Sequence, residues 1–239
     1  MPTTMPHGYT NRVTRDGLVV TKSYRGPDAP ARRAREARAL AGLAGLLPVP
    51  PLLPPRDGPP GGGPDSERDT RLETRLMPGR PGQDLIDAGQ ARGVLGACGA
   101  TLRRIHAADP VAAGITDSRQ PGQVLVHGDY GPNNVLLDPA ARHVTAVVDW
   151  EWAHAGDPLE DLAWCEWIVR MHHPGHLSAL AEFFAAYGRR PPWPGRHEAM
   201  VSRCRDMIAI CQRWEPGGDA VRRWQQRTQV TRSWTGNPQ

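Results

Sequence analysis

The segment 127–149 places three oxygen-bearing side chains at short spacings. The run His127-Gly128-Asp129 is followed by Asn134, and Asp149 comes after a later aliphatic run. Two carboxylates and an amide oxygen are ligands that a hard cation such as Mg²⁺ takes, with water and substrate phosphates completing its shell. These residue types therefore predict a magnesium site that acts on a phosphate-bearing ligand.

The elements around these side chains predict that they meet. Aliphatic runs at 135–137 and 144–148 flank a turn at Asp138-Pro139, which predicts a short β-hairpin. Because a hairpin brings its two ends together, the side chains before its first strand and after its second strand should converge. A structural turn rich in Asp and Asn would explain the turn residues. It would not explain three metal-competent side chains at these spacings.

The same spacing resembles that of a known enzyme family. Protein kinases use H-R-D-x-x-x-x-N, followed by a metal-binding Asp after the next strand. The stretch VHGDYGPNNVLLD…VVDWEWAHAGDPLEDLAW resembles the H-G-D-x-x-x-x-N pattern of the aminoglycoside phosphotransferase and choline kinase-like family. The resemblance implies an α+β, two-lobed protein-kinase-like fold. A small β-rich amino-terminal lobe would span residues 1–78, and a mostly helical carboxy-terminal lobe would span residues 79–239.

The resemblance also implies roles for individual residues. Asp129 would be the catalytic residue that takes or orients the proton of an acceptor hydroxyl, and Asn134 and Asp149 would hold Mg²⁺. His127 and Asp161 would support the catalytic loop from behind. The nucleotide would be ATP or GTP, and its γ-phosphoryl group would pass to a small molecule.

Lysine occurs once in the chain, at Lys22, against 28 arginines. An ammonium is a compact point charge that enters tight sites beside phosphate, whereas a guanidinium is a wide planar fork. Lys22 lies near the end of a predicted strand at 17–24, where the resembling fold keeps its phosphate-binding lysine. Glu36, the only acid of a predicted helix at 29–46, would pair with it. Chance placement of the lysine and a solvated glutamate remain the alternatives.

Other segments of the amino-terminal half carry weaker patterns. Residues 1–24 predict a hairpin with a single glycine in place of a Gly-rich phosphate loop, so this lobe is expected to be reduced. Residues 54–69 are rich in Pro and Gly and predict a mobile loop. A strand at 71–77 would join the lobes, and the resemblance implies that backbone groups near Arg75 and Met77 hold the adenine.

The carboxy-terminal half is predicted to be helical. Asp157, Pro158 and Glu160 form a capping-box pattern that starts a helix at about 158–172, one turn before Asp161. Residues 176–234 predict further helices, interrupted at 190–194 and 215–218. Over residues 161–239, eleven arginines exceed seven acidic residues by four, which argues against a strongly cationic acceptor. An uncharged or aromatic hydroxyl compound fits this tryptophan-rich half.

Composition bounds the class of protein. The 239 residues carry a formal charge of +4, which is too weak to imply nucleic acid, and the arginine clusters come with no recognition motif. No run approaches 18 apolar residues and no signal peptide is evident, so no membrane contact is expected. Four cysteines without C-x-x-C spacing predict reduced thiols in a cytoplasmic protein.

The sequence therefore predicts an ATP- and Mg²⁺-dependent phosphotransferase with an alcohol group as acceptor. One alternative is a pseudokinase-like module that binds a nucleotide or a partner without turnover. The reduced amino-terminal lobe favours this alternative, and the complete set of Asp129, Asn134 and Asp149 opposes it. The acceptor, the preference for ATP over GTP and the oligomeric state do not follow from these residues.

Overall fold

The structure, a computed structural model, describes residues 3–4, 11–54 and 70–236. The expected loop at 54–69 lies outside the described residues, except for its first residue. So does the start of the expected amino-terminal hairpin, residues 5–10.

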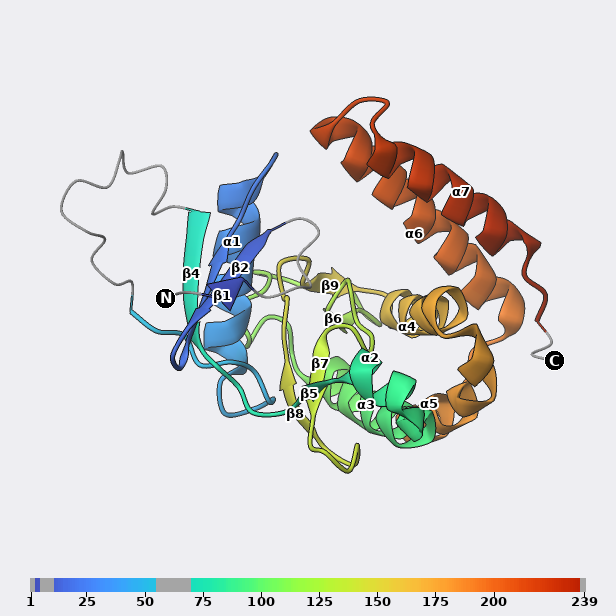
Figure 1. Cartoon of the computed structure of the whole chain (residues 1–239), viewed down its shortest axis with the longest axis horizontal. Coiled ribbons are helices and arrows are strands. Elements are labelled where there is room, and N and C mark those ends of the chain that lie inside the picture. The colour runs from blue at the N-terminus through green and yellow to red at the C-terminus, as the bar shows by residue number, and fades with distance from the viewer. Residues whose placement is uncertain (1–2, 5–10, 55–69, 237–239) are drawn as a thin grey trace.

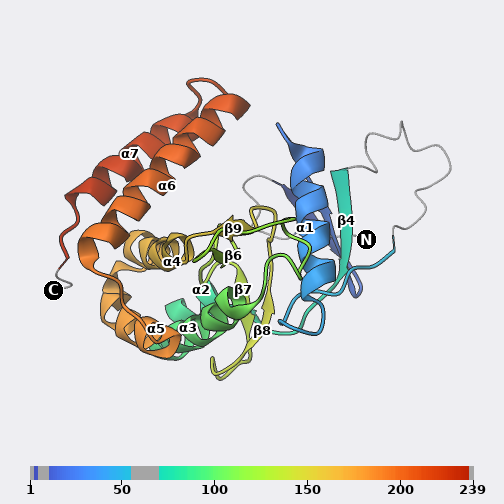
Figure 2. The ribbon, with the colours of Figure 1, turned by 180° about the vertical axis from the view of Figure 1, so that it is seen from behind.

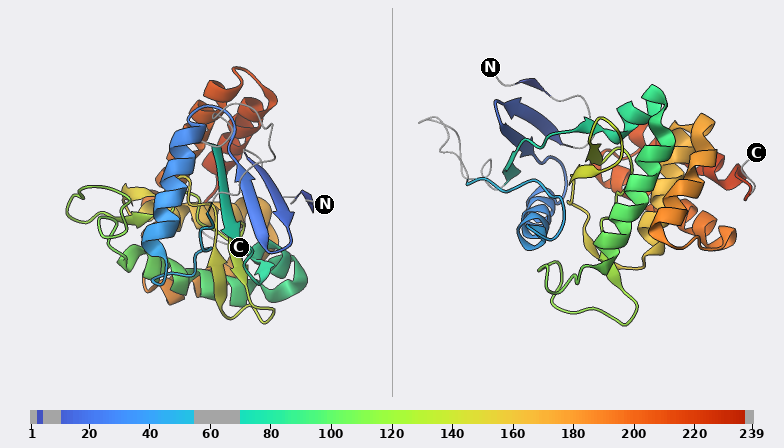
Figure 3. Two further views of the ribbon diagram at one scale, coloured as in Figure 1. Left: turned by 90° about the vertical axis from the view of Figure 1, so that its left-hand side faces the viewer. Right: turned by 90° about the horizontal axis from the view of Figure 1, so that it is seen from below.

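A small antiparallel sheet forms the amino-terminal part of the molecule (Figure 1). Its strand order is β1-β2-β3-β4, with the bounds Thr3–Thr4, Arg12–Asp16, Val19–Ser23 and Arg71–Arg75. The predicted hairpin turn is confirmed, because Gly17 lies between β2 and β3 at a φ of 59°, a conformation that glycine adopts without steric cost. Helix α1 (Ala29–Leu43) lies alongside this sheet, as the side view in Figure 3 shows.

The rest of the described chain is mostly helical. The short strands are β5 (Arg80–Pro81), β6 (Val124–Val126), β7 (Val135–Leu137), β8 (Val144–Val147) and β9 (His154–Gly156). The helices are α2 (Gly82–Leu85), the π-turn η2 (Ile86–Gln90), α3 (Ala91–Ala107), α4 (Leu159–His172), the 3-10 helix η3 (Pro174–Ala179), α5 (Leu180–Tyr187), α6 (Trp193–Trp214) and α7 (Asp219–Ser233). This arrangement confirms the predicted two-lobed α+β architecture.

Two apolar clusters hold the helical part together. In the larger cluster α3 packs closely on α5, because Gly99 has no side chain and a Cβ there would lie 2.1 Å from the carbonyl oxygen of Phe183. The smaller cluster joins α4 to α6, and its members include Trp164, Trp167 and Met200. Helices α6 and α7 form an antiparallel pair along one side of the molecule, which Figure 2 shows from behind. All four cysteines are free thiols.

Two short hairpin-like pairings position the candidate site. Strand β7 pairs antiparallel with β8, as predicted, and β6 pairs antiparallel with β9. His127 follows the end of β6, and Asp149 follows shortly after β8. The four strand ends therefore bring residues 127–134 and 148–152 together in front of the amino-terminal sheet.

Most predicted element boundaries are close to those observed. Helix α1 ends at Leu43, three residues early, because Leu46 and Leu47 donate their N–H groups back to the Leu43 carbonyl in a turn. Strand β4 ends at Arg75 and not at residue 77. None of the helices in the described residues is both long and apolar enough to cross a membrane.

The capping box before α4 is present as predicted. The Asp157 carboxylate accepts the N–H of Leu159 at 2.8 Å, and the Glu160 carboxylate accepts the N–H of Asp157 at 2.9 Å. These reciprocal bonds satisfy N–H groups that the first turn of a helix leaves without an intrahelical partner. Helix α4 therefore starts at a defined place, which determines where Asp161 lies.

Candidate active site

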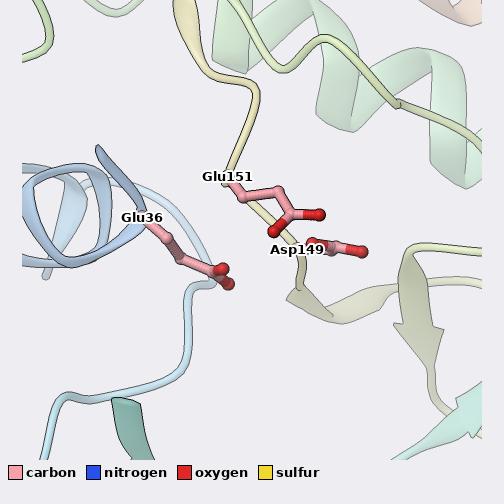
Figure 4. Close-up of side chains that lie close together, drawn as sticks. All are labelled: Glu36, Asp149 and Glu151. Carbon is pink, nitrogen blue, oxygen red and sulfur yellow. The ribbon is translucent and has the colours of Figure 1, made fainter. Parts of the chain in front are cut away.

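Lys22 lies at the centre of three carboxylates, where the amino-terminal sheet meets the segment after β8. Its Nζ donates to Glu36 Oε2 at 2.6 Å and to Asp149 Oδ1, and it lies 3.6 Å from Glu151 Oε2. Figure 4 shows Glu36 reaching in from α1 toward Asp149 and Glu151. The predicted Lys22–Glu36 pair is therefore present.

The three carboxylates form the surroundings of this lysine. One oxygen from each lies within 4.8 Å of the others, so their charges would repel strongly without a cation between them. Burial disfavours the charged ammonium, but Asp149, Glu36 and Glu151 outweigh it and raise the pKa of Lys22 well above its ordinary value. Lys22 is therefore a permanent cation at the centre of the cluster.

Glu151 is a member of this cluster that the sequence analysis missed. Its carboxylate accepts two hydrogen bonds from Asn11 Nδ2, at 2.9 and 3.1 Å, and one from Arg32 at 2.9 Å. Burial and the nearby Asp149 raise the pKa of Glu151 to about 7, although Lys22 and Arg32 oppose the shift. The sequence did hold an indication, since an acid lies between Trp150 and Trp152 directly after Asp149.

Asp149 has an unusual backbone conformation. Its φ of 69° lies in the left-handed region, which Asp tolerates better than most residues and which often occurs at functional sites. The N–H of the preceding Val148 donates to the carbonyl of Asn134 at 3.0 Å. Burial would raise the pKa of Asp149, but the charge and hydrogen bond of Lys22 lower it, so the carboxylate stays ionised. Two predicted metal ligands, Asn134 and Asp149, are thus brought close together by a main-chain hydrogen bond between their segments.

Asp129 is held by two donors. Its Oδ1 accepts the indole N–H of Trp164 at 2.6 Å, and its Oδ2 accepts Nδ2 of Asn134 at 2.8 Å. The same Nδ2 also donates to the main-chain carbonyl of Asp129 at 2.8 Å. Because the amide nitrogen is turned toward Asp129, the Oδ1 atom of Asn134 points away as the only atom able to bind a cation. Burial and Asp149 raise the pKa of Asp129, against Trp164, Arg203 and His127.

Asp161 and His127 lie behind this loop. The buried Asp161 carboxylate accepts the main-chain N–H groups of His127 at 2.7 Å and Gly128 at 2.9 Å, and it lies 3.2 Å from Nε2 of His106. His127 Nδ1 accepts the N–H of Asp129 at 3.2 Å, so the ring proton is on Nε2, which lies 3.0 Å from the Val148 carbonyl. Both residues therefore contact the loop backbone where they were expected.

Gly128 cannot be replaced by a larger residue without a change in the backbone. Its φ is 83°, and a Cβ at this position would lie 2.7 Å from the carbonyl oxygen of Trp152. This close approach brings the segment after Asp149 against the loop that carries Asp129. Glycine is thus required in the H-G-D run both because a side chain would clash with Trp152 and because the backbone φ is positive.

Two main-chain N–H groups of the segment expected to hold adenine already have hydrogen-bond partners within the protein. The N–H of Arg75 donates to the carbonyl of Pro51 at 2.9 Å, and the N–H of Leu76 donates to that of Leu18 at 2.8 Å. Among the described residues, no main-chain hydrogen bond uses the N–H of Met77. The Met77 N–H is therefore available to a ligand, whereas the N–H groups of Arg75 and Leu76 are already used.

A cavity of about 520 Å³ opens beside the loop that carries Asp129, and Gly128 of that loop lines it. Trp164 also lines it, and both residues contact or adjoin Asp129. Helix α6 forms another wall, from which Arg203 donates to the carbonyl of Gly128 at 2.8 Å. Trp152 completes an aromatic side. This cavity gives a small molecule access to the Asp129 loop.

A comparison with protein families assigns the chain. The phosphotransferase enzyme family matches residues 3–123 and 112–200, which is most of the length. The chain belongs to this family. The resemblance inferred from the H-G-D-x-x-x-x-N run is thereby confirmed.

Solved structures with low sequence identity share the fold of this family member. Macrolide 2'-phosphotransferase MphH from Brachybacterium faecium is 22% identical with a TM-score of 0.64, covering 99% of this chain and 93% of that one. The GDP and kanamycin complex of APH(2")-IIia is 12% identical with a TM-score of 0.75, covering 98% and 93%. A choline/ethanolamine kinase family protein from Mesorhizobium loti is 16% identical with a TM-score of 0.64, covering 100% and 89%.

Curated relatives match over short segments. Acyl-CoA dehydrogenase family member 10 of Mus musculus is 44% identical over 46 residues, which is 19% of this chain and 4% of that protein. Acyl-CoA dehydrogenase family member 11 of Homo sapiens is 29% identical over 92 residues, which is 38% of this chain and 11% of that protein. The match therefore spans only a small part of these much longer proteins.

The family pattern located one part of the site and missed another. Lys22, Glu36, Asp129, Asn134 and Asp149 were all expected, and the structure gathers them where the two lobes meet. The side chains that surround these residues from outside the pattern, either directly or through Glu151 and Gly128, were missed. These are Asn11, Arg32, Glu151, Trp164 and Arg203.

Proposed function

We propose that this chain is an ATP- or GTP-dependent kinase that uses Mg²⁺ and transfers the γ-phosphoryl group to a hydroxyl of a small molecule. The observation that carries the proposal is the gathering of the Lys22–Glu36 pair, Asp149 and the Asn134–Asp129 loop at one junction. Phosphoryl transfer needs positioned charges more than covalent help, and this set supplies them.

Residues 1–78 would form the nucleotide-binding lobe, and residues 79–239 the catalytic and acceptor-binding lobe. Lys22 would bind the α and β phosphates while Glu36 orients it. The main chain at Arg75 and Met77 would hold the adenine. Because Lys22 now also donates to Asp149, binding of a nucleotide would exchange that contact for one with phosphate. This exchange would free the Asp149 carboxylate.

The side chains fit a magnesium ion. Asn134 presents its amide oxygen because its nitrogen is committed to Asp129, and Asp149 stays ionised. Both would hold Mg²⁺, a hard cation that prefers such oxygen ligands. When bound, the ion supplies positive charge that neutralises the phosphates.

Asp129 would act on the acceptor hydroxyl. As the hydroxyl oxygen forms a bond to the γ-phosphorus, the bond from that phosphorus to the bridging oxygen of the nucleoside diphosphate breaks, and the hydroxyl proton passes to Asp129. Asp161 and His127 hold the main chain of this loop in place. Their role is to position Asp129, since neither would touch the reacting atoms.

The test is phosphoryl transfer from ATP to a panel of hydroxyl compounds, in the parent protein and in Asp129→Asn. General base catalysis contributes about 10²–10⁴-fold, so the variant is expected to lose about that factor in kcat. Its affinity for Mg·ATP should remain, because Asp129 is not among the proposed nucleotide contacts. Equal turnover by the two proteins would refute the role of Asp129.

A module that binds nucleotide without turnover is the second candidate. The observation that favours it is that both Asp129 carboxylate oxygens already accept hydrogen bonds, from Trp164 and Asn134. An acceptor hydroxyl would have to share or displace one of these donors. Binding of Mg·ATP with no transfer to any acceptor would support this candidate.

The four free thiols fit a cytoplasmic location for either function.

A further inference from the structure

Two arginines from opposite sides of the molecule line the cavity beside Asp129. Arg203 comes from α6, in the carboxy-terminal helix pair, and Arg35 comes from α1, beside the amino-terminal sheet. The inference that follows rests on the proposed function, because it treats this cavity as the place where the acceptor binds.

Arg203 lines the cavity where it meets the Asp129 loop. Its guanidinium donates to the carbonyl of Gly128 at 2.8 Å, directly before Asp129. The same group lies 5.7 Å from the ring centroid of Trp164 and 6.0 Å from that of Trp152. A guanidinium has five N–H donors, so one bond to a carbonyl leaves donors for a ligand. The two aromatic rings hold the side chain in a defined place.

Arg35 is fixed in a similar way. It donates to the main-chain carbonyl of Glu151 at 3.0 Å and not to a carboxylate. Within the described part of the chain, neither Arg35 nor Arg203 forms an ion pair. Two guanidinium charges therefore face one cavity, each held by a backbone carbonyl and neither neutralised by a bound acid.

The cavity wall also carries three carboxylates, two of which accept hydrogen bonds from protein groups. Glu160 accepts a bond from His154 Nε2 at 3.0 Å, and Asp157 accepts the N–H of Leu159 at 2.8 Å. Asp206 is exposed. The charged side chain of the cavity wall that donates to the backbone of the Asp129 loop is Arg203.

We propose that Arg203 and Arg35 form an anion subsite in the acceptor cavity, and that the acceptor is a small hydroxyl compound with a carboxylate or phosphate group. Planar guanidinium groups bind both anions through paired, charge-assisted hydrogen bonds. Because the two arginines come from different parts of the chain, the anion would also bridge α1 and α6.

The test uses four compounds that share a three-carbon frame and differ in charge. These are glycerol, glycerate, glycerol 3-phosphate and the cationic 2-amino-1,3-propanediol. Each is titrated into the protein with Mg·ADP in excess, which keeps phosphate out of the nucleotide site. The fluorescence of Trp152 and Trp164 in the cavity wall reports binding. We expect at least one anionic compound to bind about tenfold or more tightly than glycerol and the amine, which is about 1.4 kcal/mol.

The variants identify the residues responsible. Arg203→Gln and Arg35→Gln should each remove most of the preference for the anion. Arg205→Gln, which removes the same charge from an exposed position two residues along α6, should keep it. If Arg203→Gln does not fold, the Arg35→Gln result decides. The tighter of glycerate and glycerol 3-phosphate identifies which anion the acceptor carries.

Several results would overturn the subsite. Tighter binding of the amine would do so, as would binding of neither anion, or an anion preference that survives both substitutions. The proposed kinase activity fails separately. If Mg·ATP does not bind while an Arg203-dependent anion preference remains, the subsite stands and the kinase assignment does not.

Discussion

Asp161 shows how a single buried carboxylate can organise the residues around a reaction centre. It accepts the main-chain N–H groups of His127 and Gly128 and contacts His106, although it is not itself one of the residues that line the cavity. Burial would raise its pKa, but the bonds from His106 and His127 outweigh burial and lower it. The ionised form is therefore the one that the folded protein holds.

The lowered pKa of Asp161 predicts how stability depends on pH. A carboxylate whose folded pKa lies below its unfolded value of about 3.9 contributes stability above that value and loses it as pH falls through the folded pKa. Asp161→Asn should therefore cost about 2–3 kcal/mol in the free energy of unfolding at pH 7. The cost should shrink below about pH 4.

Urea unfolding at pH 7 and at pH 3 measures this difference. The exposed Asp117→Asn is the matched control, with an expected change within about 0.5 kcal/mol at both pH values. A cost for Asp161→Asn that is the same at pH 3 as at pH 7 would contradict the ionised role of this carboxylate.

The residues that the sequence predicted share a local pattern, and those it missed do not. Asp129 and Asn134 lie five positions apart, and Lys22 stood out as the only lysine. By contrast, Trp164 reaches Asp129 across 35 positions, and Arg203 reaches Gly128 across 75. Contacts of this kind depend on how the helices pack in three dimensions. No fixed spacing in a single sequence predicts that packing.

At the scale of elements, Glu151 connects three parts of the fold. It accepts bonds from Asn11 before β2 and from Arg32 on α1, and it belongs to the segment that follows β8. The Glu151 and Arg32 side chains are each 1% exposed. Removal of one member of such a buried pair leaves the other charge without compensation, which is costly.

Arg32→Gln should therefore destabilise the protein by about 3–5 kcal/mol at pH 8, where Glu151, whose pKa is raised to about 7, is ionised and would lose its buried cation. Thermal or denaturant unfolding measures the loss. The control is Glu182→Gln, which weakens an exposed pair with Arg92 and should cost less than about 1 kcal/mol. A loss no greater than that of the control would show that the Arg32–Glu151 pair does not hold α1 against the segment after β8.

The order and type of the elements could be predicted more fully than their ends. Pro and Gly mark the interruptions before α6 and α7, and Gly89, at a φ of 85°, lies in the π-turn η2 before α3. Helix α1 ended early because Gly45 takes a φ of 78° and the chain at 44–47 turns back on Leu43, a local signal that the sequence analysis did not use. The placement of α6 against the catalytic loop has no such local signal, because it depends on how the helices pack.

At the scale of the whole molecule, two sets of contacts join the amino-terminal part to the helical part. On one side Lys22 joins the amino-terminal sheet to Asp149. On the other side the end of α6 contacts the amino-terminal lobe, where Arg213 pairs with Asp28 and a Cβ on Gly26 would lie 2.9 Å from the ring of Trp214. Both lobes thus contribute to the cavity wall, and binding of a nucleotide and of an acceptor should be coupled through these contacts.

The measurement that tests the account most directly is unfolding of the parent protein and Asp149→Asn with no ligand, with ATP plus EDTA, and with ATP plus Mg²⁺. Asn is chosen because it tolerates the left-handed backbone of this position. Ligand at a hundredfold excess over Kd stabilises the native state by about 2.7 kcal/mol. We expect this Mg²⁺-dependent gain in the parent protein and its loss in Asp149→Asn. No gain in the parent protein, or an equal gain in both, would contradict a nucleotide site built on Lys22, Asn134 and Asp149.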